Sequence, residues 1–220
     1  MRNVRIWFNK TSECKYISHL DLNRVMLRAV RRAQLPMWVT EGFNPHPFVT
    51  FPLPISLGIS GLRECMDIRI IDDTFDISLI PEMINPFLPG GIQVFDATYP
   101  QYDPKYITFA EYKAEISVDK MSGAELRGAI EEICSDEELI IKKKSKAGFK
   151  DVDMLPFVKA FEFSDVSDDS LSFRVVLPAG NTKNIGLPLV LKAIENKLEK
   201  EISYDIVKLN MFTEEMTPFA

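Results

Sequence analysis

The chain has 220 residues, enough for one large domain or two small ones, of which 46% are hydrophobic and 26% are charged. No apolar run approaches the roughly 18 residues that a membrane helix needs, and charges within MRNVRIWFNK argue against a secretory signal. The three cysteines, Cys14, Cys65 and Cys134, fit no zinc or iron–sulfur spacing, so we expect free thiols in a reducing cytoplasm.

The charges are distributed unevenly along the chain. The formal net charge is −6, yet residues 1–71 carry ten basic and five acidic side chains, while residues 72–220 carry sixteen basic and twenty-seven acidic ones. Both histidines also lie in the positive part. This asymmetry predicts that the first part of the chain meets an anion and that the second part has another role.

The first half of the sequence predicts the element order β-α-β-β-α-β. Apolar and polar residues alternate over residues 3–9, as in a strand, and Ser18 begins a helix with one apolar face that Pro36 ends. The elements that follow are a strand at 37–40, a long loop at 41–63, a strand at 65–71, a helix at 77–88 and a strand at 92–98. This is the order of the split βαβ, or ferredoxin-like, unit.

The second half repeats this order after a joint at residues 99–108 that contains Pro and Tyr. Its predicted elements are a strand at 112–118, a helix from Ser122, a strand at 139–143, a hairpin of 157–163 and 171–177, a helix at 187–198 and a strand at 202–212. It has one strand more than the template, so one hairpin arm is an insertion or part of a long bent strand. The prediction is an α+β chain of two tandem ferredoxin-like units with antiparallel sheets, residues 1–98 and 109–220.

Four arginines and no lysine follow helical spacing on the first helix. They are Arg24, Arg28, Arg31 and Arg32. Guanidinium groups bind phosphate or carboxylate through two parallel hydrogen bonds, whereas lysine would suffice for solubility. These arginines therefore either face phosphate or form a solvated helix face with an internal Asp21–Arg24 pair.

A second basic cluster lies in the otherwise acidic half, within KKKSKAGFK. It includes Lys142, Lys143 and Lys144. It is typical of a flexible loop that follows a nucleic-acid backbone, or of a charged turn that balances nearby acids.

The stretch EGFNPHPFVTFPLP, residues 41–54, predicts a stiff loop because it holds four prolines. Residues before proline favour extended backbone, which fixes the direction of the side chain at position 46. We interpret the loop as the wall of a site beside the arginine helix, formed by Gly42, Phe43, Asn44, Pro45, His46 and Pro47. If they are exposed, Phe43, Phe48 or Phe51 can stack on a base.

The two histidines, His19 and His46, are candidates for the base and acid of metal-free RNA cleavage. The alternative is that His19 caps the helix and His46 fixes the loop. No motif supplies a third metal ligand, so no metal or cofactor is expected. Aspartates 67, 72, 73 and 76 flank a strand end and a turn, where their usual role is to bond the backbone.

Three segments resemble the signature of a bacterial domain of unknown function, the radical SAM-linked domain. They are YISHLDLNRVMLRAVRRAQLP, EGFNPHPFVTFPLPISLGI and ECMDIRI. The shared features are Ser18 to Asp21, Arg31 with Arg32, Gly42 to Pro47, Pro54 to Gly58, and Glu64 with Asp67 and Ile68. The resemblance covers about residues 5–71, and Phe48 stands where lysine is frequent in that family.

The resemblance implies a partner, because members are often fused to, or encoded beside, a cobalamin-binding radical SAM protein. This chain has no Cys-x-x-x-Cys-x-x-Cys motif, so it is expected to be an accessory module and not the radical enzyme. The expected role is to bind tRNA or rRNA, or to present a substrate, in RNA modification or processing. The alternatives are an endoribonuclease that uses His19 and His46, and a protein-interaction scaffold for the same partner.

Overall fold

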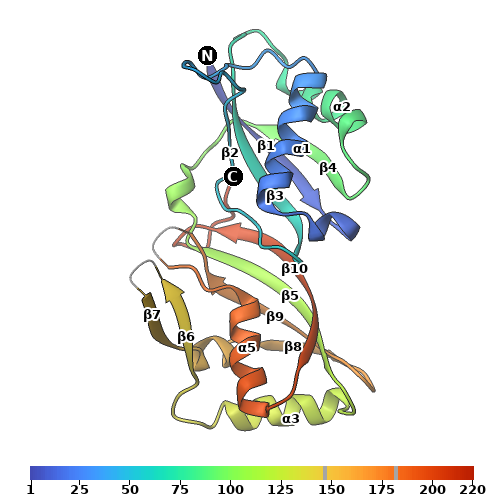
Figure 1. Ribbon diagram of the computed structural model, residues 1–220, viewed down its shortest axis with the longest axis vertical. Helices are drawn as coiled ribbons and strands as arrows, with labels where there is room; N and C mark the ends of the chain where they lie inside the picture. Colours follow the sequence, from blue (N-terminus) through green and yellow to red (C-terminus); the bar gives the residue numbers. More distant parts are fainter. Residues whose placement is uncertain (146–147, 181–182) are drawn as a thin grey trace. The chain divides into compact units, whose positions relative to one another are not determined.

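The computed structural model describes every residue except 146–147 and 181–182. The side chains of residues 144 and 145 also lie outside the described part. The chain divides into two compact units (Figure 1). The first consists of Met1–Phe109 and Val207–Ala220, and the second of Ala110–Ile206. The sequence-based division differs, because it assigned residues 207–220 to the second unit. They belong to the first because Val207 and Lys208 pair with strand β3 there.

The first unit is built on an antiparallel sheet of four strands in the order β4-β1-β3-β2. The strands are β1 (Arg2–Lys10), β2 (Val49–Thr50), β3 (Ser60–Ile70) and β4 (Ile92–Thr98). Val207 and Lys208, in the middle of β10 (Ile202–Phe212), pair in parallel with β3. The predicted strand at 37–40 is wrong, since Met37 and Val39 form only isolated bridges and the short strand β2 lies ten residues later.

Helix α1 (His19–Arg32) begins where the sequence predicted. The Ser18 side chain caps it by accepting a hydrogen bond from the backbone N–H of Asp21 at 3.1 Å. Its apolar face packs on one face of the sheet, against Val4, Ile6 and Phe8 of β1. This face of the sheet holds the main hydrophobic core of the first unit.

The predicted helix at 77–88 is broken into three short pieces. They are η2 (Ile77–Leu79), α2 (Ile80–Ile84) and η3 (Asn85–Phe87). Pro81 and Pro86 lack the backbone N–H that a continuous helix needs, so each stands in the first turn of a new piece. Two further 3-10 turns are η1 (Ser12–Tyr16) and η4 (Pro104–Tyr106).

The second unit has a sheet in the order β10-β5-β9-β8 and a separate two-stranded sheet, β6-β7. Both arms of the predicted hairpin lie in the main sheet as β8 and β9, so neither arm is the expected insertion. The extra segment is the strand predicted at 139–143, which pairs with the unpredicted β7. The predicted strand at 157–163 is partly wrong, because a helical turn occupies its first residues. The elements are β5 (Phe109–Val118), α3 (Gly123–Ile133), β6 (Ile140–Ser145), β7 (Gly148–Asp153), α4 (Leu155–Val158), β8 (Glu162–Val166), β9 (Leu171–Pro178) and α5 (Leu187–Leu198).

Taken unit by unit, the molecule is a mixed α+β protein whose paired strands are mostly antiparallel. Within residues 1–145, 148–180 and 183–220, none of the helices has the length and apolar character needed to span a membrane.

Candidate nucleic-acid interface

The four arginines of α1 lie on the helix face opposite its buried residues. All four are exposed, while Leu22, Met26, Ala29 and Val30 are buried. Arg24 donates a hydrogen bond to Asp21 across 3.1 Å. In the described part of the chain, Arg28, Arg31 and Arg32 have no carboxylate partner. The α1 arginine face therefore offers three free guanidinium groups to an anion.

His19 occupies the first position of α1, where its ring meets the edge of Phe51 at a centroid distance of 5.0 Å. Phe51 in turn packs against Phe8, 6.3 Å away, so it is partly buried against the core and does not stand free in solvent as base stacking would need. Burial against this cluster lowers the pKa of His19, and the nearby charge of Lys10 lowers it further.

The loop that the sequence singled out is closed by His46 and Thr40. The His46 backbone N–H donates to Thr40 Oγ1 at 3.1 Å, and Thr40 donates its own N–H to the His46 carbonyl at 2.9 Å. His46 Nδ1 lies 2.9 Å from the Asn44 carbonyl. Gly42 permits the tight path with φ +120°, and Phe43 projects fully into solvent.

His46 therefore fixes the loop, as one of the two interpretations expected. None of the contacts among the described residues joins it to His19, so cleavage by this pair of histidines stays a prediction.

The other face of the first sheet carries no helix and holds polar and charged side chains on β1 and β3. Asn3 and Arg5 on β1 stand opposite Arg69 and Asp67 on β3. The Arg5 guanidinium binds Asp67 through two hydrogen bonds, from Nε at 2.8 Å and from Nη2 at 2.9 Å. Arg5 is fully buried, because the ring of Phe219 covers it at 4.2 Å.

A hollow of about 540 Å³ lies on this helix-free face. Arg69 stands on its wall with the guanidinium over Phe48 at 4.4 Å and over Trp38 at 5.3 Å. The hollow is lined by Asn3, Arg5, Phe48, Thr50, Asp67, Arg69 and the segment 100–104. All of these residues belong to the first unit.

A buried ion pair joins β3 and β10. Glu64 Oε2 and Lys208 Nζ lie 2.8 Å apart, and both side chains are almost fully buried. Burial raises the pKa of Glu64, while the charges of Lys208 and then Lys10 oppose the rise. Lys10 is itself buried and donates to the carbonyls of Lys15 and Ile17, which fixes the turn before α1.

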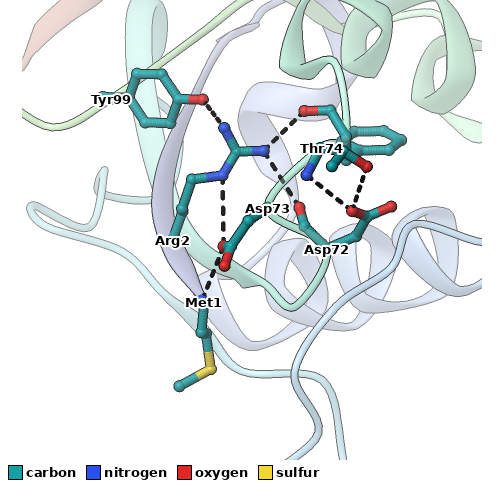
Figure 2. Close-up of polar contacts among 7 residues, drawn as sticks. Met1, Arg2, Asp72, Asp73, Thr74 and Tyr99 are labelled. Atoms are coloured by element: carbon teal, nitrogen blue, oxygen red, sulfur yellow. Dashed lines mark hydrogen bonds and ion pairs between the residues drawn. The ribbon is translucent and has the colours of Figure 1, made fainter.

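Of the aspartates that the sequence expected to bond the backbone, Asp72 and Asp76 do so, whereas Asp73 pairs with the N-terminus and Asp67 with Arg5. Asp72 accepts from the N–H and the hydroxyl of Thr74, and Asp73 pairs with the Met1 amino group at 2.8 Å (Figure 2). Arg2 lies between these residues and the Tyr99 hydroxyl. The described part of the chain holds no cluster of three or more His, Cys, Asp or Glu side chains arranged for a metal.

The lysine cluster lies on the β6-β7 hairpin of the second unit. Lys142 is exposed opposite Asp151, and Lys143 donates to the Asn184 carbonyl. The side chain of Lys144 and the whole of Lys146 lie outside the described residues. The hairpin thus presents Lys142 and Lys150 as its exposed described cations, and the α1 arginine face, with three, remains the stronger anion site.

Sequence reasoning missed the hollow, although a signal was present. Arg5 on β1 and Asp67 with Arg69 on β3 interrupt strands whose alternate residues are apolar. When charged residues occupy alternate positions on two neighbouring strands, their side chains share one face of the sheet, and that face is predicted to be polar. The element order alone did not show which strands were neighbours.

The fold and the site define the class of this protein. It is a mixed α+β protein with mostly antiparallel sheets, and its described residues hold no metal cluster. The particular family follows from sequence comparison. The chain belongs to a bacterial family described as "Uncharacterized protein conserved in bacteria (DUF2344)", whose model matches residues 3–186. None of the curated proteins matches the chain.

Among solved structures, a chain of "Crystal Structure of a Cbf5-Nop10-Gar1 Complex" is similar to this one. The alignment covers 96% of the present chain, with a TM-score of 0.50 and 12% sequence identity. The present chain spans about half of that one, 50% of its length. This likeness concerns the fold alone. An unknown protein from Galdieria sulphuraria aligns over 94% of this chain and 98% of its own, with 14% identity, but its TM-score of 0.29 is too low to indicate a shared fold.

Proposed function

We propose that this chain is an RNA-binding module. The observation that carries the proposal is the α1 arginine face, on which Arg28, Arg31 and Arg32 have no carboxylate partner among the described residues. Helical spacing places them along one side of α1, so together they can contact successive phosphates. The exposed Phe43 adds a ring that can stack on an unpaired base.

The net charge of −6 does not oppose this proposal, because binding depends on the local field. The acidic excess lies in residues 72–220, whereas the arginine face belongs to the positive part of the sequence. RNA is favoured over a small anion because several exposed guanidinium groups lie along one helix face, which suits a row of phosphates.

The partner and the finer fold are inferred as well. We infer that the module acts in the cytoplasm with a radical SAM enzyme in tRNA or rRNA modification, which the sequence resemblance over about residues 5–71 supports. Free thiols at all three cysteines agree with a reducing compartment. We also infer two ferredoxin-like units, since the orders β4-β1-β3-β2 and β10-β5-β9-β8 suit two split βαβ sheets.

The test is binding of total tRNA and rRNA fragments across a salt series. Replacing Arg28, Arg31 and Arg32 with Gln keeps good helix formers and removes the three positive charges that carry the proposal. We expect weaker binding, and we expect the slope of log affinity against log salt to fall by about 2, as for the loss of three phosphate contacts to single strands.

The matched control removes the same charge from exposed positions of the second unit. Lys113, Lys159 and Lys200 serve, each replaced by Gln. Equal losses of RNA affinity in the two triple variants would show a nonspecific charge effect and contradict the proposal. RNA affinity that does not change with salt concentration would also contradict it. If a radical SAM enzyme co-purifies after nuclease treatment and no RNA binds, the chain is a protein scaffold instead.

A further inference from the structure

The hollow on the helix-free face has the dimensions of a small-ligand site. Its volume of about 540 Å³ lies within the roughly 300–1,000 Å³ of typical ligand pockets. Its lining combines the aromatic ring of Phe48 with four side chains that form hydrogen bonds, Asn3, Thr50, Asp67 and Arg69. A planar, polar ligand with an anionic group suits this lining.

Asp67 supplies a fixed acceptor at the base of the hollow. Arg5 holds both of its oxygens, and Arg5 is itself held by the carbonyls of Tyr102 at 3.1 Å and Ala220 at 2.9 Å. Each carboxylate oxygen keeps further lone pairs, and the Asp67 side chain is 14% exposed. A ligand that meets Asp67 must therefore bring an N–H or O–H donor, because a carbonyl there would be repelled.

Arg69 supplies a fixed donor on the wall. Its register partner on β1 is the neutral Asn3, and within the described residues it has no carboxylate partner. The rings of Phe48 and Trp38 support the guanidinium from below, which leaves N–H groups at its edge for an anion. A phosphate fits these donors better than a neutral group does.

We propose that this hollow holds one nucleotide of the bound RNA, with its phosphate at Arg69 and an amino-bearing base at Asp67. The inference rests on the RNA-binding function proposed above and extends it to a site for a single base. Adenine, cytosine and guanine carry exocyclic amino groups. Uracil has carbonyls at the corresponding positions, and its N3–H donor lies between two carbonyls that Asp67 would repel. Cytosine and uracil form the matched pair, because position 4 is an amino group in one and a carbonyl in the other.

The direct test adds cytidine or uridine monophosphate to the ¹⁵N-labelled full chain and follows the backbone amides by NMR. We expect cytidine monophosphate to shift the amides of Thr50, Asp67 and Gln101, and uridine monophosphate to need about tenfold higher concentration. Equal responses to the two nucleotides would overturn the assignment of the base. No response from these amides to either nucleotide would overturn the site.

Variants locate the binding without disturbing the buried Arg5–Asp67 pair. Asn3→Trp fills the rim of the hollow from an exposed position and should abolish the shifts. Gln93→Trp places the same ring at an exposed position of β4, outside the lining, and should leave them unchanged. Arg69→Gln should weaken both nucleotides equally, because it removes the phosphate contact and leaves the base contact.

The outcomes for the hollow and for the arginine face are separable. Suppose that tRNA binds the chain, that the α1 arginine variant binds it more weakly, and that neither nucleotide shifts the amides of the hollow. The present inference then fails and the proposed function stands. If cytidine monophosphate binds in the hollow and no RNA binds the chain, the RNA-binding proposal fails and the ligand of the hollow is a free nucleotide.

Discussion

Glu64 on β3 and Lys208 on β10 form an ion pair of 2.8 Å inside the first unit, with both side chains almost completely excluded from solvent. The pair fixes the returning end of the chain to β3, although 144 positions separate the two residues in the sequence. A buried pair contributes little net stability compared with well-packed apolar residues. It does make each partner depend strongly on the other.

We therefore expect Lys208→Met to destabilise the first unit by about 3–5 kcal/mol, because it leaves the Glu64 carboxylate buried without its main cation. The double variant Glu64→Leu with Lys208→Met should recover most of that loss. Urea denaturation followed by the fluorescence of Trp7, which is buried in the same unit, measures both changes. A double variant no more stable than the single one would contradict this view of the pair.

Gly61 is required because the Glu64 side chain occupies the space beside it. A Cβ atom at position 61 would lie 2.6 Å from Glu64 Cγ and 2.7 Å from Glu64 Cδ. Both residues belong to β3, so a movement of Glu64 would also disturb Lys208. We expect Gly61→Ala to cost about 1–3 kcal/mol, as overpacking does, with a lower urea midpoint.

The matched control for that variant is Gly128→Ala. Gly128 is exposed on helix α3, and a Cβ there meets nothing within 4 Å. It should be neutral or should stabilise by up to about 1 kcal/mol, because Ala favours a helix more than Gly does. If the two alanine variants lose equal stability, Glu64 does not limit position 61.

His19 should titrate below its ordinary pKa of 6.5, because burial against the Phe51 cluster and the charge of Lys10 both disfavour its protonated form. A lowered pKa in the folded state means that this contribution to stability is complete above pH 6.5. It is lost as the pH falls through the folded pKa. The ring proton shifts of His19, followed by NMR across pH, measure the pKa directly.

The same titration of His19 in the variant Phe51→Leu tests the cause of the lowered pKa. The substitution removes the ring that covers His19 and should move the pKa back towards 6.5 while Lys10 remains. A His19 pKa at or above 6.5 in the unchanged protein would contradict the assignment. A neutral His19 at pH 7 is compatible with the role of a general base, so the measurement also bears on the endoribonuclease alternative.

The sequence predicted best where a local signal and tertiary packing agree. The start of α1 followed from Ser18 and Asp21, and β1 followed from simple alternation, so both are confirmed. The helix at 77–88 failed because the two prolines outweighed the apolar pattern around them. The strand at 37–40 failed because its residues form only isolated bridges, Met37 with Ile70 and Val39 with Pro47.

Only the part of the candidate site that depends on a local sequence pattern was predicted. The exposure of the α1 arginines follows from the position of the apolar stripe on one helix, which sequence spacing reveals. The hollow depends on which strands are neighbours, and the Arg5–Asp67 pair joins residues 62 positions apart. Spacing within one element cannot show such a contact. Phe51 was a candidate for stacking, but its position against Phe8 became evident only from the fold.

Asn85 protects the outer edge of the first sheet, and this gives the last prediction. Its side chain donates from Nδ2 to the Val94 carbonyl and accepts the Val94 N–H at Oδ1, both at 2.8 Å. Val94 belongs to the edge strand β4, whose outward backbone groups would otherwise be open to a second chain. Asn85→Ala should therefore cost about 1–3 kcal/mol and should accelerate hydrogen exchange at the Val94 amide.

Asn85→Asp separates the two hydrogen bonds. The carboxylate still accepts from the Val94 N–H but cannot donate to its carbonyl, so amide protection should survive better than in Asn85→Ala while stability still falls. Ser78→Ala, which removes the hydroxyl that donates to the nearby Asp76, is the control for a polar loss away from the sheet edge. Increased light scattering on storage of Asn85→Ala, and not of Ser78→Ala, would support edge protection. Unchanged exchange at Val94 in Asn85→Ala would contradict it.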